Sequence, residues 1–362
     1  METTDGRLRI GISGSYGGMN LGDEAILDGM LSQLRATVPA DITVFSRNPS
    51  DTLGRHKIEH AVPVRSLTRK EITPEVEQLD LLVLGGGGIL YAISAGPLTL
   101  PGSRRVVAEA LNAAASPVIT VRDRLGYRLL EDVGVTQPIH LTADPALLLE
   151  PEEPPVDALI AEGVQLERHL VGFSVREPGP AAPDIDPEDY YALLANSADF
   201  MIRRYDADVV FVPMERTDVQ HSHAVVAHMQ NAERAEILRR RYSPRQILAL
   251  MGRFDFAVGM RLHFLIFAAL RGTPFAALPY ASKVTGLLED LEMETPPLAD
   301  IGIGQLIARI DRSWDTREQI RAKIRGRLPG LKSRARQTNE LLVGLVRERF
   351  PERILGEPPA PN

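Results

Sequence analysis

Residues 258–283 decide the fold, and they read V-G-M-R-L-H-F-L-I-F-A-A-L-R-G-T-P-F-A-A-L-P-Y-A-S-K. Residues 254–258 are typical of a buried strand, and residues 262–270 are apolar on nearly every face of a helix. A helix of that kind is normally buried. Arg261 and His263 therefore lie at a strand-to-helix turn, where an open α/β sheet presents its ligand-binding crevice.

Arg261 brings a charge into this apolar segment. Burying a guanidinium without a partner costs several kcal/mol, so we expect its side chain to face an anion or a carboxylate. The two interpretations are an anion-binding site and a structural ion pair. Lys283 comes just after the next predicted strand, residues 275–279, and this second cation favours the anion-binding site.

The composition is that of a globular protein large enough for two domains. The chain has 362 residues, 44% of them hydrophobic and 25% charged, which is ordinary for such a protein. Its formal net charge of −7 argues against sequence-independent binding of nucleic acid, and we expect no nucleic-acid partner. The absence of cysteine excludes disulfides, thiolate zinc sites and a cysteine nucleophile.

We expect a cytoplasmic protein. The sequence shows no secretory signal and no run of about 20 apolar residues that could span a bilayer. Residues 312–353 nevertheless contain 12 Lys or Arg against 5 Asp or Glu. A solvated helix face is the usual explanation for such a region. The alternative is peripheral contact with an acidic partner or with the inner face of the membrane.

Strand and helix patterns alternate along both halves of the chain. Predicted strands cover residues 7–13, 41–46, 79–84 and 118–121 in the first half, and 170–175 and 208–213 in the second. Predicted helices include residues 23–34, 187–205 and 243–251, the last with Ser243 as N-cap and Pro244 in its first turn. This alternation predicts an α/β fold with two Rossmann-like doubly wound domains facing each other.

The domains are expected at residues 1–155 and 156–312, joined by an acidic, proline-rich linker around residues 150–157. Residues 313–362 are expected to form a helical segment and tail that packs back across both domains, with the helix broken at Pro329-Gly330.

One connection is too short for this arrangement. Glycines 85–88 end a predicted strand, and only two residues separate them from an apolar segment at 91–95. A parallel crossover usually takes a dozen or more residues. Three explanations stay open: residues 91–95 do not form a neighbouring parallel strand, a crossover helix has been lost, or residues are missing from the sequence at this point.

Two glycine-rich turns are candidate ligand loops. Residues 14–24 read G-S-Y-G-G-M-N-L-G-D-E between a strand and a helix, where glycines allow close approach of a ligand and the helix N-terminus favours an anion. The spacing matches neither a dinucleotide fingerprint nor a P-loop. Asp23 and Glu24 therefore only cap the helix, or Asn20, Asp23 or both contact a ligand. The run at 85–88 forms either a tight turn or a close-approach site.

Other charged residues follow predicted strands. Arg122 and Asp123 come after one of them and could form a buried ion pair. Three histidines, His221, His223 and His228, have no carboxylate spacing that supports a metal site, and we interpret them as surface residues ahead of a polar helix. No metal site is predicted.

Together these features resemble the polysaccharide pyruvyl transferase family. The carrying segments are residues 14–27, 82–90, 119–135, 142–149 and 259–274, which include G-S-Y-G-G-M-N-L-G-D-E, L-V-L-G-G-G-G-I-L, I-T-V-R-D, T-A-D-P and G-M-R-L-H. The resemblance spans roughly residues 8–291, and its last motif is the most specific. It implies two Rossmann-like domains in the GT-B arrangement, with phosphoenolpyruvate as donor. The chain departs from the family in lacking the helix between the glycine run and Gly96-Pro97.

The resemblance also implies roles for individual residues. The family's Arg-Leu-His motif falls on Arg261 and His263, its Val-Arg-Asp arginine on Arg122, and its lysine after the next strand on Lys283. These arginines and the lysine are the expected donor-binding residues, with Arg176 added because it ends the first strand of the second domain. Expected acceptor-binding residues are Ser15, Tyr16, Gly17, Asn20, Gly86 and Gly87.

Two residues are expected to take part in catalysis. Imidazole titrates near neutral pH, which makes His263 the candidate general acid. Asp23 is a weaker candidate for the base or for positioning the acceptor.

The predicted function is transfer of a pyruvyl group from phosphoenolpyruvate to hydroxyls of a nucleotide- or lipid-linked saccharide, with ketal formation, in surface polysaccharide biosynthesis. Phosphoenolpyruvate is a co-substrate, and no cofactor is expected. One alternative is a GT-B glycosyltransferase that uses a nucleotide sugar. Another is a non-catalytic relative that binds an anion or a glycan. Formation of a homo-oligomer stays open.

Overall fold

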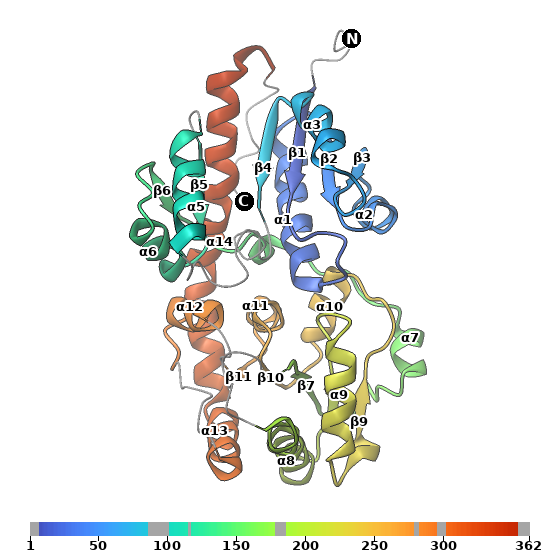
Figure 1. Ribbon diagram of the computed structural model, residues 1–362. Coiled ribbons are helices and arrows are strands. Elements are labelled where there is room, and N and C mark those ends of the chain that lie inside the picture. Colours follow the sequence, from blue (N-terminus) through green and yellow to red (C-terminus); the bar gives the residue numbers. More distant parts are fainter. Residues whose placement is uncertain are drawn as a thin grey trace. The chain divides into compact units, whose positions relative to one another are not determined.

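The computed structural model describes residues 7–85, 101–114, 117–177, 186–278, 282–294 and 302–353. The chain divides into two compact units, each of which is an α/β unit (Figure 1). Unit 1 contains Met1–Leu149 and Lys332–Asn362, and unit 2 contains Glu150–Leu331. Residues 150–155, assigned to the first domain from sequence, thus belong to unit 2, and the C-terminal segment divides between the two units.

Unit 1 is built on a parallel sheet with the strand order β3-β2-β1-β4. Its strands are β1 (Leu8–Ser13), β2 (Ala40–Ser46), β3 (His60–Pro63) and β4 (Leu81–Leu84). Three helices connect them, α1 (Leu21–Thr37), α2 (Pro49–His56) and α3 (Arg69–Glu77). The core forms where Ile10 and Ile12 of the central strand meet Leu27 and Leu31 of α1. Their spacing on α1 is that of one helical face.

A second, smaller part of unit 1 has its own pair of strands. β5 (Ile119–Val121) pairs in parallel with β6 (Ile139–Leu141), and α5 (Pro101–Ala113) and α6 (Arg124–Asp132) accompany them. Among the described strands, β5 and β6 do not join the four-stranded sheet. The 3-10 helix η1 (Pro145–Leu148) then packs against α1, where the backbone of Pro145 leaves no room for a side chain at Gly29.

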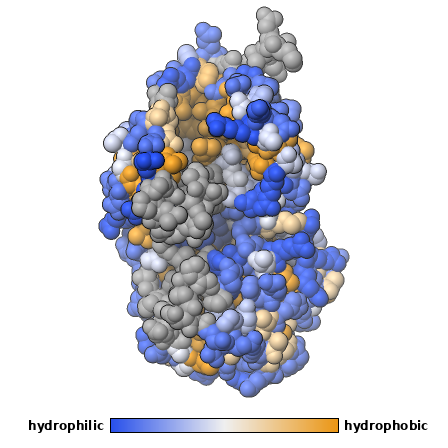
Figure 2. Space-filling view, in the orientation of Figure 1, coloured by the Kyte–Doolittle hydropathy of each residue, from blue (hydrophilic) through white to orange (hydrophobic). Residues whose placement is uncertain are grey.

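The edge strand β4 carries apolar side chains on both of its faces. Leu82 is 38% exposed and Leu84 is 66% exposed, and Figure 2 shows hydrophobic side chains gathered around this strand. Exposed apolar edges of this kind are usually covered in monomeric proteins. The edge directly precedes the connection that is too short for a crossover helix. The predicted strand at 91–95 lies outside the described residues.

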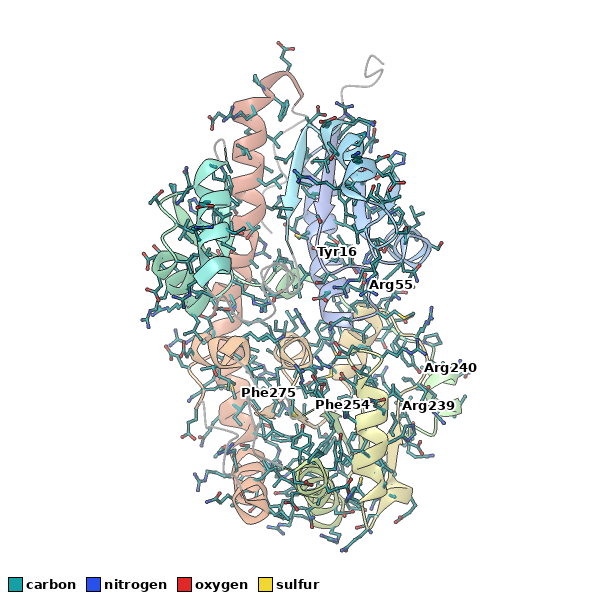
Figure 3. All side chains as sticks on the ribbon, viewed as in Figure 1. Tyr16, Arg55, Arg239, Arg240, Phe254 and Phe275 are labelled. Carbon is teal, nitrogen blue, oxygen red and sulfur yellow. The ribbon has the colours of Figure 1, made fainter. Side chains whose placement is uncertain are left out.

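Unit 2 contains a parallel sheet with the order β11-β10-β7-β8-β9. Its strands are β7 (Leu170–Ser174), β8 (Asp208–Phe211), β9 (Ala235–Ile237), β10 (Phe256–Gly259) and β11 (Phe275–Ala277). Strands β7 and β10 are buried throughout, as expected for strands covered on both faces. Phe254 and Phe275, labelled in Figure 3, are buried in this core.

The helices of unit 2 agree with most of the sequence signals. They are α7 (Val156–Ala161), α8 (Pro187–Tyr205), α9 (Asp218–Ala227), α10 (Pro244–Met251), α11 (Leu262–Arg271), α12 (Ser282–Asp290) and α13 (Ile303–Asp315). The predicted start of α10 is confirmed, because Ser243 accepts a hydrogen bond from the backbone N–H of Gln246 at 3.1 Å and Pro244 occupies the first turn. None of the described helices is long and apolar enough to cross a membrane.

The C-terminal helix α14 (Arg317–Arg349) is continuous through Pro329. The predicted break at Pro329-Gly330 is therefore wrong. Proline removes one helical hydrogen bond and crowds the preceding turn, but apolar burial on both sides holds the helix together. Ile324 and Leu331 are buried in unit 2, and Val346 is buried in the core of unit 1.

The basic face of α14 is only partly solvated. Arg325 is exposed, as expected. Arg321, however, donates from Nε to the carbonyl of Gly272 at 3.1 Å, and the guanidinium of Arg317 lies 5.0 Å from the ring centroid of Trp314. The long arginine side chains thus contribute packing as well as charge.

Replacing Gly330 with Ala distinguishes a continuous helix from a broken one. A methyl group at Gly330 or Gly326 meets open space, so each change is expected to raise the free energy of unfolding by about 1 kcal/mol. Chemical denaturation measures both. If the helix ended near Pro329, Gly330→Ala would destabilise the protein while the control, Gly326→Ala, would still stabilise it.

Candidate functional site

Both sheets reverse their strand order beside their first strand. In unit 1 the reversal lies between β1 and β4, and in unit 2 it lies between β7 and β10. At such a switch point the connections leave neighbouring strands in opposite directions, and a crevice opens at the carboxyl ends of the strands. The residues that follow these four strands therefore define the candidate site of each unit.

In unit 1, Tyr16 links the two loops at the switch point. Its hydroxyl donates to the backbone carbonyl of Gly85, which follows β4, and its ring is buried (Figure 3). Burial raises the pKa of Tyr16, and the negative charges of Asp23, Glu24 and Asp144 raise it further. The hydroxyl therefore stays protonated as a donor. The expected acceptor-binding residue Tyr16 thus supports the loop from inside.

A buried carboxylate holds the first glycine loop in shape. Glu24 Oε1 accepts a hydrogen bond from the backbone N–H of Gly17 at 2.8 Å, and Glu24 Oε2 lies 2.7 Å from His56 Nε2. Both side chains are buried. From the sequence, Glu24 was interpreted only as a possible helix cap, and His56 was not singled out. The sequence did contain a signal that Glu24 is buried. Glu24 has the helical spacing of Leu27 and Leu31, and all three lie on the buried face of α1.

Asn20 is the N-cap of α1, which begins at Leu21 and not at the predicted residue 23. Its side-chain oxygen accepts hydrogen bonds from the backbone N–H groups of Gly22 at 2.9 Å and Asp23 at 3.3 Å. The helix is therefore capped by Asn20, and not by Asp23 or Glu24, which the capping interpretation had named. Asp23 is half-buried in the first turn, where a carboxylate interacts favourably with the helix dipole.

The remaining expected acceptor-binding residues fall in different places. Ser15 is half-buried in the loop after β1. Gly86 and Gly87 lie outside the described residues.

Arg122 follows β5 in unit 1, and two aspartates hold it. Its Nη1 donates to Asp144 Oδ2 at 3.0 Å, and its Nε lies 3.6 Å from Asp123 Oδ2. Each aspartate also caps the short helix that follows it. The predicted pairing with Asp123 is present, although the Arg122 side chain is part-exposed. The shorter contact is to Asp144 of the T-A-D-P motif, which the sequence analysis did not connect with Arg122.

The centre of the unit 2 site is the buried Arg261, which is 8% exposed. It follows β10 and is the N-cap residue of α11. Its Nε donates to Asp218 Oδ2 at 3.0 Å, and its Nη2 contacts Asp218 Oδ1 and Glu215 Oε1, the latter at 2.9 Å. The expectation that Arg261 faces an anion or a carboxylate is confirmed in the form of an ion pair. These contacts show a guanidinium paired with carboxylates. They do not show the unopposed positive charge expected of an anion-binding site.

Asp218 is the carboxylate that the sequence analysis missed. It is fully buried at the start of α9, where it also accepts hydrogen bonds from the backbone N–H groups of Met214 at 3.1 Å and Glu215 at 3.2 Å. Burial raises the pKa of Asp218, and the bond from Arg261 opposes that rise. The signal was present, because two acidic residues follow β8 at the same sheet edge as Arg261 and a buried guanidinium requires such a partner.

Arg176 follows β7, on the other side of the switch point from Arg261. Its guanidinium pairs with Glu177, and its side chain is largely buried. Its backbone carbonyl accepts a hydrogen bond from the Tyr190 hydroxyl at 2.8 Å, and the same hydroxyl contacts Met260 Sδ. Burial raises the pKa of Tyr190. A buried tyrosine therefore links the two loops of this switch point, as Tyr16 does in unit 1.

His221 lies inside this cluster. Its side chain is only 13% exposed, Nδ1 lies 2.7 Å from the Tyr191 hydroxyl, and Nε2 lies 3.8 Å from Glu177 Oε2. The interpretation of this histidine as a surface residue ahead of a helix is wrong, because α9 begins at Asp218 and turns His221 inward one turn later. Burial lowers the pKa of His221. His223, on the same helix, is exposed as expected.

His263 and Lys283 lie in the first turns of α11 and α12, and both are half-buried. They follow β10 and β11, so both occupy the carboxyl edge of the sheet, as predicted. The positive end of the α11 dipole adds to the positive character of this edge. Ser174, the last residue of β7, is buried there, and its Oγ has no hydrogen-bond partner among the described residues. Among all the residues that the structure describes, no group of three or more His, Asp or Glu side chains could hold a metal ion.

Solved structures define the class of fold. A putative UDP-N-acetylglucosamine 2-epimerase from Listeria monocytogenes has a TM-score of 0.64 at 12% identity, covering 98% of this chain and 99% of that one. Anabaena HepE, solved with UDP-glucose, has a TM-score of 0.58 at 15% identity, covering 95% and 100%. WaaG, a glycosyltransferase involved in lipopolysaccharide biosynthesis, has a TM-score of 0.56 at 11% identity, covering 92% and 100%. The predicted GT-B-like class, with two Rossmann-like units, is confirmed.

The sequence defines the family within this class. The profile described as polysaccharide pyruvyl transferase matches residues 20–282, which is more than half of the chain. The chain belongs to the polysaccharide pyruvyl transferase family. The matched range includes Arg122, Arg176, Arg261 and His263 and ends one residue before Lys283. A search of curated proteins finds no match.

Gly17→Ala tests the shape of the first loop. Gly17 has φ of +70°, and a Cβ there would lie 2.2 Å from Ser46 Oγ and 2.6 Å from Asn48 N. Left-handed backbone alone costs an alanine about 1–2 kcal/mol, so a larger loss of unfolding free energy is expected. In the control, Gly18→Ala, the nearest atom is the flexible end of Arg47 at 3.3 Å, and the loss should be small. Equal losses by thermal denaturation would contradict this loop structure.

Asp218→Ala tests the buried ion pair. Removing one partner leaves an uncompensated buried charge, which is expected to lower the free energy of unfolding by about 3–5 kcal/mol. The control, Glu215→Ala, removes a more exposed carboxylate that contacts the same guanidinium, and its loss should be clearly smaller. Urea denaturation measures both variants. An effect of Asp218→Ala no larger than that of the control would show that the pair does not hold this site.

Proposed function

We propose that this protein transfers a pyruvyl group from phosphoenolpyruvate to hydroxyls of a saccharide in surface polysaccharide biosynthesis, with formation of a ketal. Membership of the polysaccharide pyruvyl transferase family supports a transferase of polysaccharide biosynthesis. The observation that carries the proposal is the position of Arg176 and Arg261. They follow the two strands that flank the unit 2 switch point, the place where an open α/β sheet binds its ligand.

Phosphoenolpyruvate carries a carboxylate and a phosphate, and guanidinium groups bind both in a bidentate manner. We assign Arg261 and Arg176 to these groups, with Lys283 as a further point charge. Arg122 is a further proposed donor-binding residue. The carboxylates of Asp218 and Glu215 fix the plane of the Arg261 guanidinium before any ligand arrives. Such support from neighbouring side chains is what holds a binding group in its productive geometry.

The reaction requires an acid near the methylene carbon of the donor. A proton is added to that carbon while the oxygen of one saccharide hydroxyl bonds to the central carbon and gives up its own proton. The bond from the central carbon to the phosphate oxygen then breaks, and the oxygen of a second hydroxyl takes its place. The proton of that hydroxyl leaves with the phosphate. We assign the first proton to His263 at the start of α11.

The acceptor is proposed to be a nucleotide- or lipid-linked saccharide. The loop of residues 14–24 in unit 1 supports this assignment, because its shape is fixed from inside by Tyr16 and Glu24 while Ser15 and Asp23 keep part of their surface exposed. Asp23 is proposed to position the acceptor or to receive a hydroxyl proton. The cations of the donor site neutralise the leaving phosphate, so the proposal uses no metal ion.

Ligand-dependent thermal stability tests the donor. Phosphoenolpyruvate at about 100 times its Kd should stabilise the protein by about 2.7 kcal/mol, and uridine diphosphate should not. Stabilisation by uridine diphosphate alone would instead favour a glycosyltransferase that uses a nucleotide sugar. If phosphoenolpyruvate binds but no phosphate is released with a panel of UDP-hexoses and their N-acetyl derivatives, a non-catalytic relative becomes the better description.

His263→Ala tests the assigned acid. Removing a general acid typically lowers kcat by about 10²–10⁴-fold, and stabilisation by phosphoenolpyruvate should persist because the arginines are unchanged. Phosphate release measures the rate. The control is His223→Ala, which removes an exposed histidine of the same unit and should leave the rate unchanged. Equal turnover of His263→Ala and the unaltered protein would reject the role of His263.

A further inference from the structure

The charges around His221 do not match those of the proposed donor. The described charged neighbours are Arg176 and Glu177 after β7, Glu215 before α9, Asp218 on α9 and Arg261 before α11. Two guanidinium groups thus face three carboxylates. Phosphoenolpyruvate brings a carboxylate and a doubly ionised phosphate, and like charges at this range oppose binding. Balancing this donor therefore takes positive charge beyond that of the two arginines, from the proposed Lys283 contact or from protons taken up on binding.

Within the cluster around His221, added positive charge comes from protons. Guanidinium groups are already charged at any physiological pH. Burial raises the pKa of Asp218, but its carboxylate accepts hydrogen bonds from Arg261 and from two backbone N–H groups, and such bonds oppose protonation. The imidazole of His221 is different, because an unperturbed histidine titrates near neutral pH and nearby anions favour its charged form.

His221 is placed to accept a second ring proton without leaving a polar group unsatisfied. In the neutral ring, Nδ1 lies 2.7 Å from the Tyr191 hydroxyl, which can either donate or accept. In the charged ring, Nδ1–H donates to the same oxygen, and Nε2–H points toward Glu177, whose Oε2 lies 3.8 Å away. The Tyr191 hydroxyl itself stays protonated, because burial and the charge of Glu188 raise its pKa. His228, the other histidine near the Tyr191 ring, instead lies 2.9 Å from Glu188.

Without a ligand, His221 is held neutral. Burial lowers its pKa most, Arg261 and Arg176 lower it further, and Asp218 and Glu215 oppose the shift. An anion bound beside the two arginines would offset their effect and raise the pKa of His221. The same residue therefore has two protonation states, selected by the ligand.

We propose that His221 is a further donor-binding residue, which takes up one proton from solvent when phosphoenolpyruvate binds beside Arg176 and Arg261. This inference rests on the proposed function and adds a residue to its donor site. The proton returns to solvent when phosphate leaves. The requirement for added charge also favours a phosphate ester with three negative charges over a singly charged carboxylate such as pyruvate.

The sign of the pH dependence follows from linkage. Below the pKa of His221 in the free protein the ring is already charged, and above its pKa in the complex it stays neutral. Between the two values binding takes up a proton, and affinity falls as pH rises, by up to about tenfold per pH unit. Since burial lowers the pKa of His221 in the free protein, uptake is expected from weakly acidic pH upward to the pKa in the complex.

Isothermal titration calorimetry with phosphoenolpyruvate, in two buffers of different ionisation enthalpy, measures the uptake directly. At about pH 7.5 the ligand's own phosphate, with a second pKa of about 6, is almost fully ionised, so the protons counted belong to the protein. A clear fraction of one proton is expected. No uptake between about pH 7 and pH 8.5 would overturn the role of His221, and this result does not depend on any variant.

His221→Asn places an amide where Nδ1 lies, so it can keep the bond to Tyr191 without titrating. It should lose the uptake and bind phosphoenolpyruvate about tenfold more weakly near pH 7, with little difference near pH 9. His223→Asn, on the exposed side of the same helix, should behave like the unaltered protein. His221→Gln, with its amide at the Nε2 position, serves if the first variant does not fold.

The outcomes separate this inference from the function on which it rests. Loss of uptake in the His221 variants alone supports it. Binding of phosphoenolpyruvate with undiminished uptake in those variants overturns the role of His221 and leaves the proposed function standing. Absence of any phosphoenolpyruvate binding to the unaltered protein overturns the proposed function, and the role of His221 with it.

Discussion

The ion pair between Arg261 and Asp218 is the interaction on which the rest of the unit 2 site depends. It joins the turn after β10 to the helix after β8, which lie on opposite sides of the central strand β7. Because Asp218 also binds two backbone N–H groups of its own turn, the position of the guanidinium fixes the start of α9. His221 lies one turn further along α9, so the bond between Arg261 and Asp218 also positions His221.

In unit 1, different residues hold the loops at the switch point. Its first loop is held from below by Glu24 and His56, and Tyr16 joins it to the loop after β4. Tyr190 has the corresponding position in unit 2, where its hydroxyl bridges the loops after β7 and β10. In both units the loops at the switch point are therefore held by buried polar groups. Buried hydrogen bonds that link neighbouring loops in this way help to rigidify a site.

Local signals in the sequence predicted most of the fold. The helix α10 begins at its predicted capping residue Ser243, and the strands on either side of α11 lie where the apolar runs placed them. The site was harder to predict, because the partners of Arg261 and Arg122 come from distant segments and a buried charge does not reveal which carboxylate it will meet. Asp218 and Asp144 were missed for that reason. Pro329 shows the opposite case, in which burial of neighbours such as Leu331 overrides a local helix-breaking signal.

The pairing of every arginine proposed for the donor site with a carboxylate has a physical reason. A buried guanidinium without a ligand or another partner destabilises the folded protein by several kcal/mol. Several such groups would exceed the total stability of an ordinary protein. Carboxylates such as Asp218 remove that penalty, but they also cancel the charge that would attract a phosphate ester. A site built in this way is stable when empty, and under the inference on His221 it gains affinity for a polyanion when binding also brings protons. Stability of the empty protein and affinity for an anionic donor are thereby linked through the titrating groups that share the crevice.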